Sequence, residues 1–138
     1  MEEYYISTDK AKLNVDLIHS FLSRESYWAK GRSIEVVRKS IEHSICFGVF
    51  QGDRQLGFAR VVTDYSVFAW IMDVFILNDY RKKGLGKLLL EAIMNHNELQ
   101  NLQRWGLATD DAHGLYKQYG FRVIVKADTF MEIVSRPS

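Results

Sequence analysis

Four basic side chains and two glycines lie within seven residues, 81–87, which read Arg-Lys-Lys-Gly-Leu-Gly-Lys. This loop follows an apolar segment at residues 68–77 and precedes a segment whose apolar residues recur at helical spacing. An α-helix begins with unpaired backbone N–H groups and a partial positive charge, and glycine lets an anion approach those groups closely. The loop is therefore predicted to bind phosphate, and its four cations favour a pyrophosphate.

The segments on either side of this loop must hold it in place. Residues 68–77 are rich in β-branched and aromatic side chains, which is typical of a buried strand, and the run is shorter than the ~20 residues that a membrane helix needs. Leu85, Leu89 and Ile93 then share one helical face, so a helix is expected to begin within residues 84–87.

Asp73 is the only acid in the apolar strand. An ionised carboxylate among apolar neighbours requires partners, and this requirement holds equally for a general base and for a hydrogen-bonded structural acid. Both interpretations of Asp73 stay open at this point.

Changes of hydrophobic period divide the rest of the chain. The expected elements are a strand at 4–8, two helices capped by Asn14 and Ser33, strands at 45–50, 56–63 and 68–77, the helix after residue 84, a strand at 104–109, a short helix at 112–118 capped by Asp110 or Asp111, and a closing hairpin of strands 121–125 and 129–134. The prediction is one α/β domain over residues 1–138, with a mixed central sheet (β-α-α-β-β-β-α-β-α-β-β) and helices on both faces. Strands 68–77 and 104–109 are expected to be parallel, because a crossover helix joins them.

Composition narrows the function further. The 138 residues are 47% hydrophobic and 25% charged, with a formal net charge of +1, so neither nucleic acid nor a membrane surface is an expected partner. The single cysteine, Cys46, cannot form an internal disulfide and is expected to pack in a strand, and the acidic start lacks the features of a secretory signal. The expected compartment is the cytoplasm. The four histidines show no metal-ligand spacing, so no metal is expected.

Two motifs together resemble the GNAT superfamily of acyl-CoA-dependent N-acetyltransferases. Residues 81–86 match its pyrophosphate motif, Arg/Gln-x-x-Gly-x-Gly/Ala, and residues 112–121 (Ala-His-Gly-Leu-Tyr-Lys-Gln-Tyr-Gly-Phe) match its tyrosine-bearing helix that ends in Gly-Phe. The resemblance covers essentially the whole chain, since the order of elements also agrees. Either motif alone would be weak, but the pair is specific.

The resemblance implies acetyl-CoA as donor, with coenzyme A as product. Its pyrophosphate would lie on the backbone amides of the loop, and its pantetheine along the diverging end of strand 68–77. The cofactor positions carried over are Arg81, Lys82, Lys83, Gly84, Leu85, Gly86 and Lys87 at the pyrophosphate, and Phe75, Ile76 and Leu77 beside the pantetheine and thioester. The sequence departs from the family at 109–112, where Asp111 is the expected substitute for an asparagine and, when ionised, offers acceptor capacity only.

Tyr116 matches the family's usual general acid. Tyrosine's reference pKa of ~10 lies close enough to that of a thiol, ~8.5, for it to protonate a departing thiolate at neutral pH. A backbone N–H of strand 68–77 would polarise the thioester carbonyl. Asp73 is the candidate base, with a water relay as the alternative, and Tyr116 as a packing residue also stays open.

The loop between the first two helices is expected to line the acceptor site. Tyr27, Trp28 and Arg32 are its candidate substrate-binding residues, and an aromatic wall suits a cationic or amphipathic amine, although core packing of Trp28 is an alternative. The expected function is acetyl transfer to a primary amine of a small molecule or protein, and the alternative is a non-catalytic acyl-CoA-binding regulatory module. The identity of the acceptor stays open. The oligomeric state also stays open, although the C-terminal hairpin would offer an edge strand that could pair across a homodimer.

Overall fold

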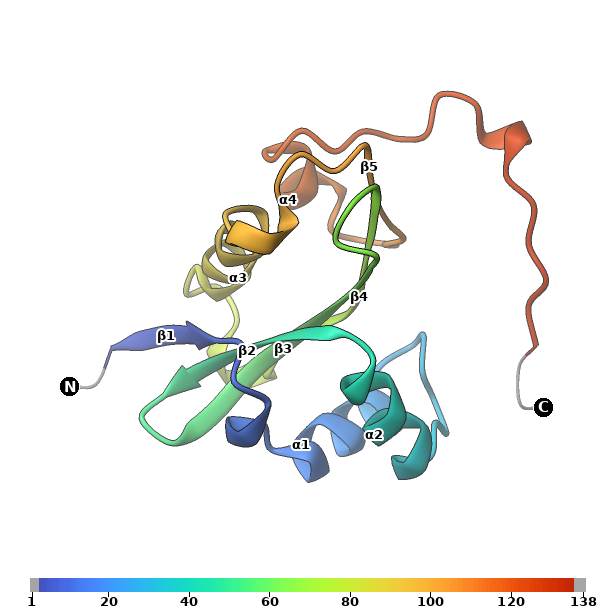
Figure 1. Ribbon diagram of the computed structural model, residues 1–138. Helices are drawn as coiled ribbons and strands as arrows, with labels where there is room; N and C mark the ends of the chain where they lie inside the picture. Colours follow the sequence, from blue (N-terminus) through green and yellow to red (C-terminus); the bar gives the residue numbers. More distant parts are fainter. Residues whose placement is uncertain (1–2, 136–138) are drawn as a thin grey trace. The chain divides into compact units, whose positions relative to one another are not determined.

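The computed structural model describes residues 3–135 and divides into two compact units, Met1–Ala108 and Thr109–Ser138. The first unit contains a five-stranded sheet (Figure 1). Its strands, which adjoin in this order, are β1 (Tyr4–Ser7), β2 (Ile45–Gln51), β3 (Arg54–Thr63), β4 (Phe68–Ile76) and β5 (Arg104–Leu107). Strands β1 to β4 are antiparallel and β5 is parallel to β4, which confirms the predicted meander and parallel pair.

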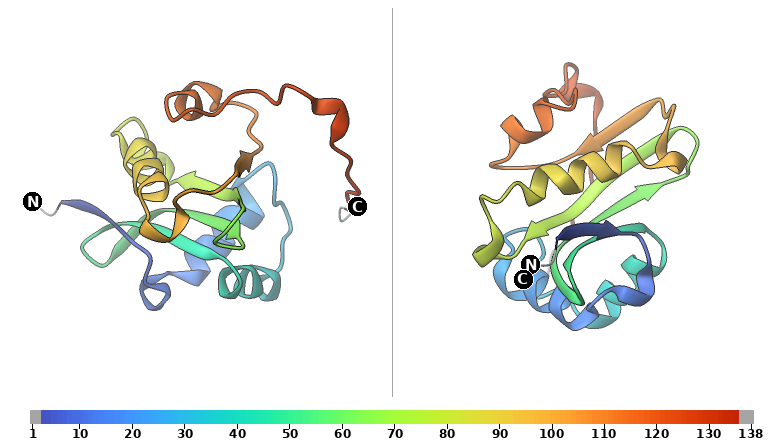
Figure 2. Two further views of the ribbon diagram at one scale, coloured as in Figure 1. Left: turned by 45° about the horizontal axis from the view of Figure 1, so that its top comes forward. Right: turned by 90° about the vertical axis from the view of Figure 1, so that its left-hand side faces the viewer.

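Helices cover both faces of this sheet. They are α1 (Val15–Ser20), the π-helical η2 (Phe21–Glu25), α2 (Ile34–Glu42) and α3 (Leu85–Met94), with short 3-10 turns η1 (Lys10–Lys12), η3 (Asn78–Tyr80) and η4 (Asn97–Leu99). The side chain of Asn14 accepts a hydrogen bond from the Leu17 N–H, and that of Ser33 from the Val36 N–H, so both predicted caps are present. Figures 1 and 2 show α1 and α2 on one face and α3 on the other.

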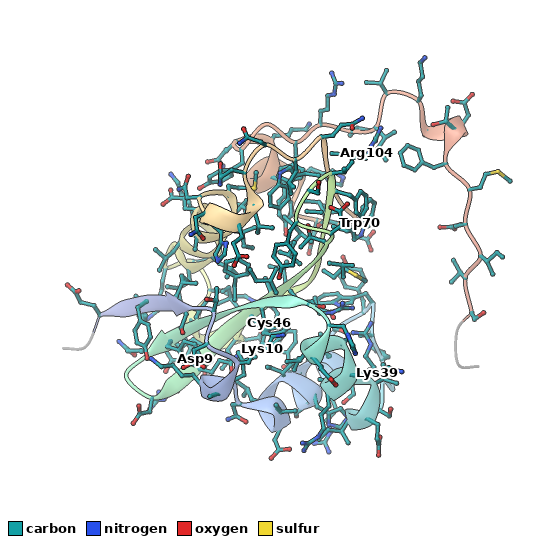
Figure 3. All side chains as sticks on the ribbon, in the orientation of Figure 1. Asp9, Lys10, Lys39, Cys46, Trp70 and Arg104 are labelled. Carbon is teal, nitrogen blue, oxygen red and sulfur yellow. The ribbon has the colours of Figure 1, made fainter. Side chains whose placement is uncertain are left out.

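The core on the α1 and α2 face holds the first unit together. Phe21 stacks on Phe75 of β4 with ring centroids 4.0 Å apart, and Cys46 of β2, labelled in Figure 3, belongs to the same cluster. Six of the seven residues of β2 are buried because both faces of this strand are covered. The predicted fold class, a mixed α/β domain with helices on both faces of a central sheet, is confirmed.

The second unit contains α4 (His113–Lys117) and the 3-10 turn η5 (Ala127–Thr129). The predicted strands at 121–125 and 129–134 are wrong: within the described part of this unit, no strand forms. β-Branched composition raises strand propensity, but a strand also needs a ladder partner and a covered apolar face. Here Met131 and Ile133 are 96% and 97% exposed. Across residues 3–135, no helix has the length and apolarity needed to cross a bilayer.

Candidate functional site

Strand β4 extends beyond the carboxyl end of its parallel partner β5. Their parallel ladder runs from Phe68 opposite Arg104 to Ile71 opposite Leu107, whereas β4 continues to Ile76. In the described part of the first unit, residues 72–76 therefore have no β5 partner. Ligands in α/β sheets bind outside the carboxyl ends of strands, and an open backbone edge offers hydrogen bonds there.

A glycine keeps the paired part of this ladder close. The ring of Trp70, labelled in Figure 3, lies against Gly106, where an added Cβ would come within 2.2 Å of a ring carbon. The two residues are opposite each other in the register. Any side chain at residue 106 would have to displace the Trp70 ring, one position before the ladder ends.

The segment after β4 enters α3 through two left-handed residues, Lys82 (φ 63°) and Gly84 (φ 79°). The helix begins at Leu85, and its first backbone bond runs from the Leu88 N–H to the Gly84 carbonyl over 3.0 Å. The N–H groups of Leu85 and Gly86 precede that bond, where helices bind anions. The predicted helix start is confirmed.

The side chains of this loop leave its backbone accessible. Residues 81–84 are exposed. Arg81 donates from Nε to the Ile76 carbonyl over 3.1 Å, and the Lys83 ammonium lies 5.7 Å from the centroid of the Tyr80 ring. Two of the four basic side chains, those of Arg81 and Lys83, are thus held between the end of β4 and the start of α3.

The three residues predicted beside the pantetheine differ in exposure. Phe75 is buried with its ring on Phe21, so it offers a ligand its backbone and not its side chain. Leu77 packs against the same core and donates its N–H to the Leu56 carbonyl over 2.8 Å. Ile76 is half-buried.

A β-bulge interrupts β4 at Asp73. Arg60 of β3 pairs with Met72 and Phe58 pairs with Phe75, so two β4 residues oppose a single β3 residue between these pairs. Asp73 has φ 56°, a left-handed conformation that aspartate tolerates better than most residues. Its side chain is only 1% exposed.

Three donors converge on the Asp73 carboxylate. Trp28 donates from Nε1 to Oδ1 over 2.9 Å, while Arg32 and Arg60 donate to Oδ2 over 2.9 and 2.6 Å. Arg60 also donates to Ser44 Oγ over 3.2 Å. We call these five residues the Asp73 cluster. It supplies the partners that a buried carboxylate requires, and both carboxylate oxygens are engaged.

The cluster holds the loop at residues 24–33, which we call the acceptor loop. Within the loop, Ser26 Oγ donates to the Leu22 carbonyl over 2.7 Å and accepts from the Ala29 N–H over 3.0 Å. The Gly31 N–H donates to the Ser23 carbonyl over 3.0 Å, and Gly31 has φ 76°, a conformation suited to glycine. These bonds fix the conformation of the loop.

The structure brings together the residues predicted to bind the acceptor. Tyr27 and Trp28 pack edge to face with centroids 5.0 Å apart, and they are 53% and 39% exposed, so Trp28 is not a core residue. The Arg32 side chain is 20% exposed. The candidate substrate-binding residues Trp28 and Arg32 both contact the candidate base Asp73.

Sequence reasoning missed Arg60 and Ser44. Arg60 is the only charged residue in the segment 56–63, just as Asp73 is the only one in 68–77. Two opposite charges in neighbouring apolar strands were a signal for a buried ion pair, since buried charges are paired. Ser44 carried no comparable signal.

In the second unit, a Schellman cap fixes Tyr116. The Phe121 N–H donates to the Tyr116 carbonyl and the Gly120 N–H to the Lys117 carbonyl, with Gly120 at φ 93°. The rings of Phe121 and Tyr116 pack edge to face at 5.9 Å. The Gly-Phe pair therefore ends the helix and holds the tyrosine, which is 7% exposed.

The hydroxyl of Thr109 forms a turn just before α4, whose N-cap residue, Ala112, makes no side-chain cap hydrogen bond. Thr109 Oγ1 accepts from the N–H groups of Asp111, over 3.4 Å, and Ala112, over 3.1 Å. The prediction of an aspartate cap is wrong, because α4 begins at His113 and Ala112 occupies its N-cap position. Asp111 is exposed, and its contact with a cofactor stays a prediction.

Neither a nucleophilic thiol nor a metal centre is indicated. Burial raises the pKa of the Cys46 thiol to about 11, which keeps it protonated near neutral pH. Among residues 3–135, no group of three or more His, Cys, Asp or Glu side chains is placed to hold a metal ion.

Comparison with known proteins places these features in a family. Residues 42–123 match the family model of the acetyltransferase (GNAT) domain. A crystal structure of a protein from Xanthomonas campestris pv. campestris, assigned to the GNAT acetyltransferases, is 44% identical, with a TM-score of 0.94 over 98% of this chain and 95% of that one. A protein from Gibberella zeae, named as an acetyltransferase, is 29% identical over 87% of this chain and 80% of its own length. Glucosamine-6-phosphate N-acetyltransferase from Arabidopsis thaliana shares the fold alone, at 15% identity and a TM-score of 0.67 over 98% and 99% of the two chains.

Proposed function

The chain belongs to the GNAT family of acetyltransferases, and from this premise we propose that it transfers the acetyl group of acetyl-CoA to a primary amine. The observation that carries the proposal is the open edge of β4 beyond Ile71, followed directly by the anion-binding start of α3. An extended pantetheine matches an unpaired strand edge, and a pyrophosphate matches helix N–H groups. The residues present therefore fit coenzyme A.

Backbone groups would do most of the cofactor binding. The N–H groups of Leu85 and Gly86 meet the pyrophosphate, and Gly84 admits it closely because no Cβ projects there. The exposed cations at 81–83 add charge attraction. The backbone of residues 72–77 binds the pantetheine, in keeping with the burial of the Phe75 side chain.

The chemistry is a direct attack. The neutral amine nitrogen bonds to the thioester carbonyl carbon, the carbon–sulfur bond breaks, the nitrogen loses one proton and the departing thiolate gains one. The bulge at Asp73 frees backbone N–H capacity in β4 that can polarise the carbonyl. Tyr116 supplies the proton to sulfur, a role supported by its fixed position in the second unit and by the family motif.

Asp73 is better suited to hold the acceptor loop than to act as the base. Both of its oxygens already accept hydrogen bonds, and two of these three bonds come from guanidinium groups. Accepting a further proton would break these bonds and leave two buried or half-buried cations without a counter-charge. We therefore assign the removal of the amine proton to a water relay.

Cofactor binding is tested with Gly84→Val, read by calorimetry with acetyl-CoA. Valine is strained at φ 79° and obstructs the phosphate approach, so we expect affinity to fall by at least about tenfold. Gly52→Val is the matched control, because Gly52 is also left-handed (φ 59°) but lies in the turn between β2 and β3. Equal affinity of both variants would refute the loop assignment.

Catalysis is tested with Tyr116→Phe. We expect kcat to fall roughly 100-fold, the low end of a general-acid contribution, with unchanged acetyl-CoA affinity. Tyr119→Phe, a control three residues later in the chain, should keep its activity. A protein that binds acetyl-CoA but acetylates no amine in a broad panel would instead be an acyl-CoA-binding module.

A further inference from the structure

We propose that the acceptor amine carries its own anionic oxygen group, a carboxylate or a phosphate, and that Arg32 binds it. This inference rests on the proposed function, since it takes the acceptor loop as the site of the amine. It adds the class of substrate, which the sequence left open among polyamines, amino acids, drugs and protein amines.

The charge balance of the Asp73 cluster points to an anion. The cluster contains two guanidinium groups and one carboxylate. Within residues 3–135, neither Arg32 nor Arg60 has a second carboxylate in ion-pair distance. One positive charge is thus uncompensated in a site that is largely shielded from water, where unpaired charge is costly and an incoming anion is favoured.

Arg32 is the guanidinium that can meet a ligand. The Arg60 side chain is 10% exposed, and its N–H groups donate to both Asp73 and Ser44. The Arg32 side chain is 20% exposed, and only its Nη1 donates to Asp73. A guanidinium has five N–H donors in a fixed fork that suits carboxylate and phosphate. In the described chain, Asp73 is the one side-chain partner of Arg32, so most of this fork is available.

The position of Arg32 suits an amine acceptor. Asp73 precedes Phe75 by two residues of β4, with the bulge between them. The proposed thioester binds along this part of β4. A small amine whose anionic group is bound by Arg32 would therefore have its nitrogen near the thioester, and the exposed rings of Tyr27 and Trp28 would contact its apolar part.

The same charges disfavour a polycationic acceptor. An aromatic wall alone suits a cation, but two arginines beside it repel one. They also favour the neutral form of a nearby amine, because a like charge disfavours its protonation. A neutral amine is the form that attacks the thioester, so the cluster assists the step without a dedicated base.

The test compares acceptors that differ only in the anionic group. The pairs are phenylalanine with 2-phenylethylamine, and O-phosphoethanolamine with ethanolamine, each compared per concentration of neutral amine. We expect kcat/KM to favour the anionic member of at least one pair by roughly 10- to 100-fold, the range for a hydrogen bond to a charged group. The pair that responds distinguishes carboxylate from phosphate.

Variants assign the preference to Arg32. Arg32→Met should bring the ratio of kcat/KM values to about 1, and Arg32→Lys should keep part of it, since the charge stays but the fork is lost. Trp28→Phe removes the hydrogen bond from Trp28 to Asp73 and leaves Arg32 in place. It should therefore lower kcat/KM for both members of a pair together and keep the ratio between them. Because the ratio is measured within each variant, a loosened loop does not mimic the result.

Each outcome decides the proposal. A wild-type preference for the uncharged members, or a ratio that Arg32→Met leaves unchanged, overturns the anionic acceptor while acetyl transfer stands. The same holds if the uncharged amines are acetylated and no anionic amine is. A protein that binds no acetyl-CoA overturns the proposed function, and this inference with it.

Discussion

The acceptor loop, residues 24–33, and the C-terminal segment, residues 121–135, are both largely irregular, but the loop is rich in polar and charged side chains and the segment in apolar ones, and they differ in what holds them. The loop is fixed by internal hydrogen bonds and by a buried carboxylate that accepts from Trp28 and Arg32. Most of the C-terminal segment is exposed, Met131 and Ile133 almost completely. Polar partners at defined positions order an irregular segment, and apolar content alone does not.

The physical reason is that hydrogen bonds are directional and apolar contacts are not. A hydrogen bond to a carboxylate fixes a distance and an angle, and each charged bond adds about 1.5–3 kcal/mol. Apolar contact is non-directional and requires a surface to cover. A two-stranded hairpin without a third strand or a helix beneath it is marginal in water, so residues 121–135 need a partner to form one.

The first prediction would break this contrast by supplying that partner. A homodimer, which the sequence left open, would cover the exposed segment with a second copy, and the protein would have twice its chain mass of 16.1 kDa in light scattering. Replacing Met131 and Ile133 with glutamate should then give the single-chain mass. Burying each such side chain contributes about 1.5–3 kcal/mol, so four of them per dimer decide its stability.

Val36→Glu is the matched control for this experiment. Val36 is 53% exposed on α2, in the first unit, and its substitution should leave the mass unchanged. A wild-type protein of single-chain mass at high concentration would contradict the homodimer. It would also show that the contrast between the two segments persists in solution.

The second prediction removes the order of the acceptor loop. Asp73→Asn keeps the shape of the side chain and tolerates φ 56°, but it leaves Arg32 and Arg60 without a counter-charge. Breaking a buried ion pair in this way costs about 3–5 kcal/mol, so the free energy of unfolding in urea should fall by that amount. Limited proteolysis should then cut the loop as readily as residues 121–135.

Asp53→Asn provides the comparison, since Asp53 is exposed in the turn between β2 and β3. Its free energy of unfolding should stay within about 0.5 kcal/mol of the wild type. If the two variants were equally stable, the Asp73 cluster would not be what holds the loop.

The sequence predicted most of the first unit because its signals are local. Caps at Asn14 and Ser33, the period-3.6 face of α3 and the apolar strands each follow from neighbouring residues. The closing hairpin failed because its formation depends on a partner that no local pattern encodes. The aspartate cap failed because α4 begins one residue later than expected, at His113, which places Ala112 at the N-cap position.

The candidate site was only partly predictable. The residue types of the anion loop and of the Tyr116 helix indicated their chemistry directly. The link between Asp73 and the acceptor loop spans more than forty positions, and it depends on a bulge whose only local signal was an acid in an apolar strand. The unpaired end of β4 depends on the register of β5 and on where β5 ends, which composition does not fix.

The third prediction has the smallest effect and concerns how well the acceptor loop excludes water from the buried cluster beneath it. Cys46 lies in the same buried cluster as Ala29 of the acceptor loop, and burial raises the pKa of its thiol from 9.0 to about 11, an effect that nearby Lys10 opposes. Between these values the unfolded chain loses the thiol proton and the folded chain keeps it. The unfolded state then binds fewer protons, so stability is retained below pH 9 and falls as pH rises toward 11, by at most about 3 kcal/mol.

Urea unfolding at pH 8 and pH 10.5 checks this loss against Cys46→Ala, which keeps every other titrating group and should lose less stability over the same interval. At pH 8, native Cys46 should react with Ellman's reagent only through opening of the fold, and Asp73→Asn should speed that reaction because it frees the loop above the cluster. Immediate reaction in the wild type would mean that the loop does not seal the core. Equal rates in both proteins would instead mean that the thiol is reached by a route that the Asp73 cluster does not control.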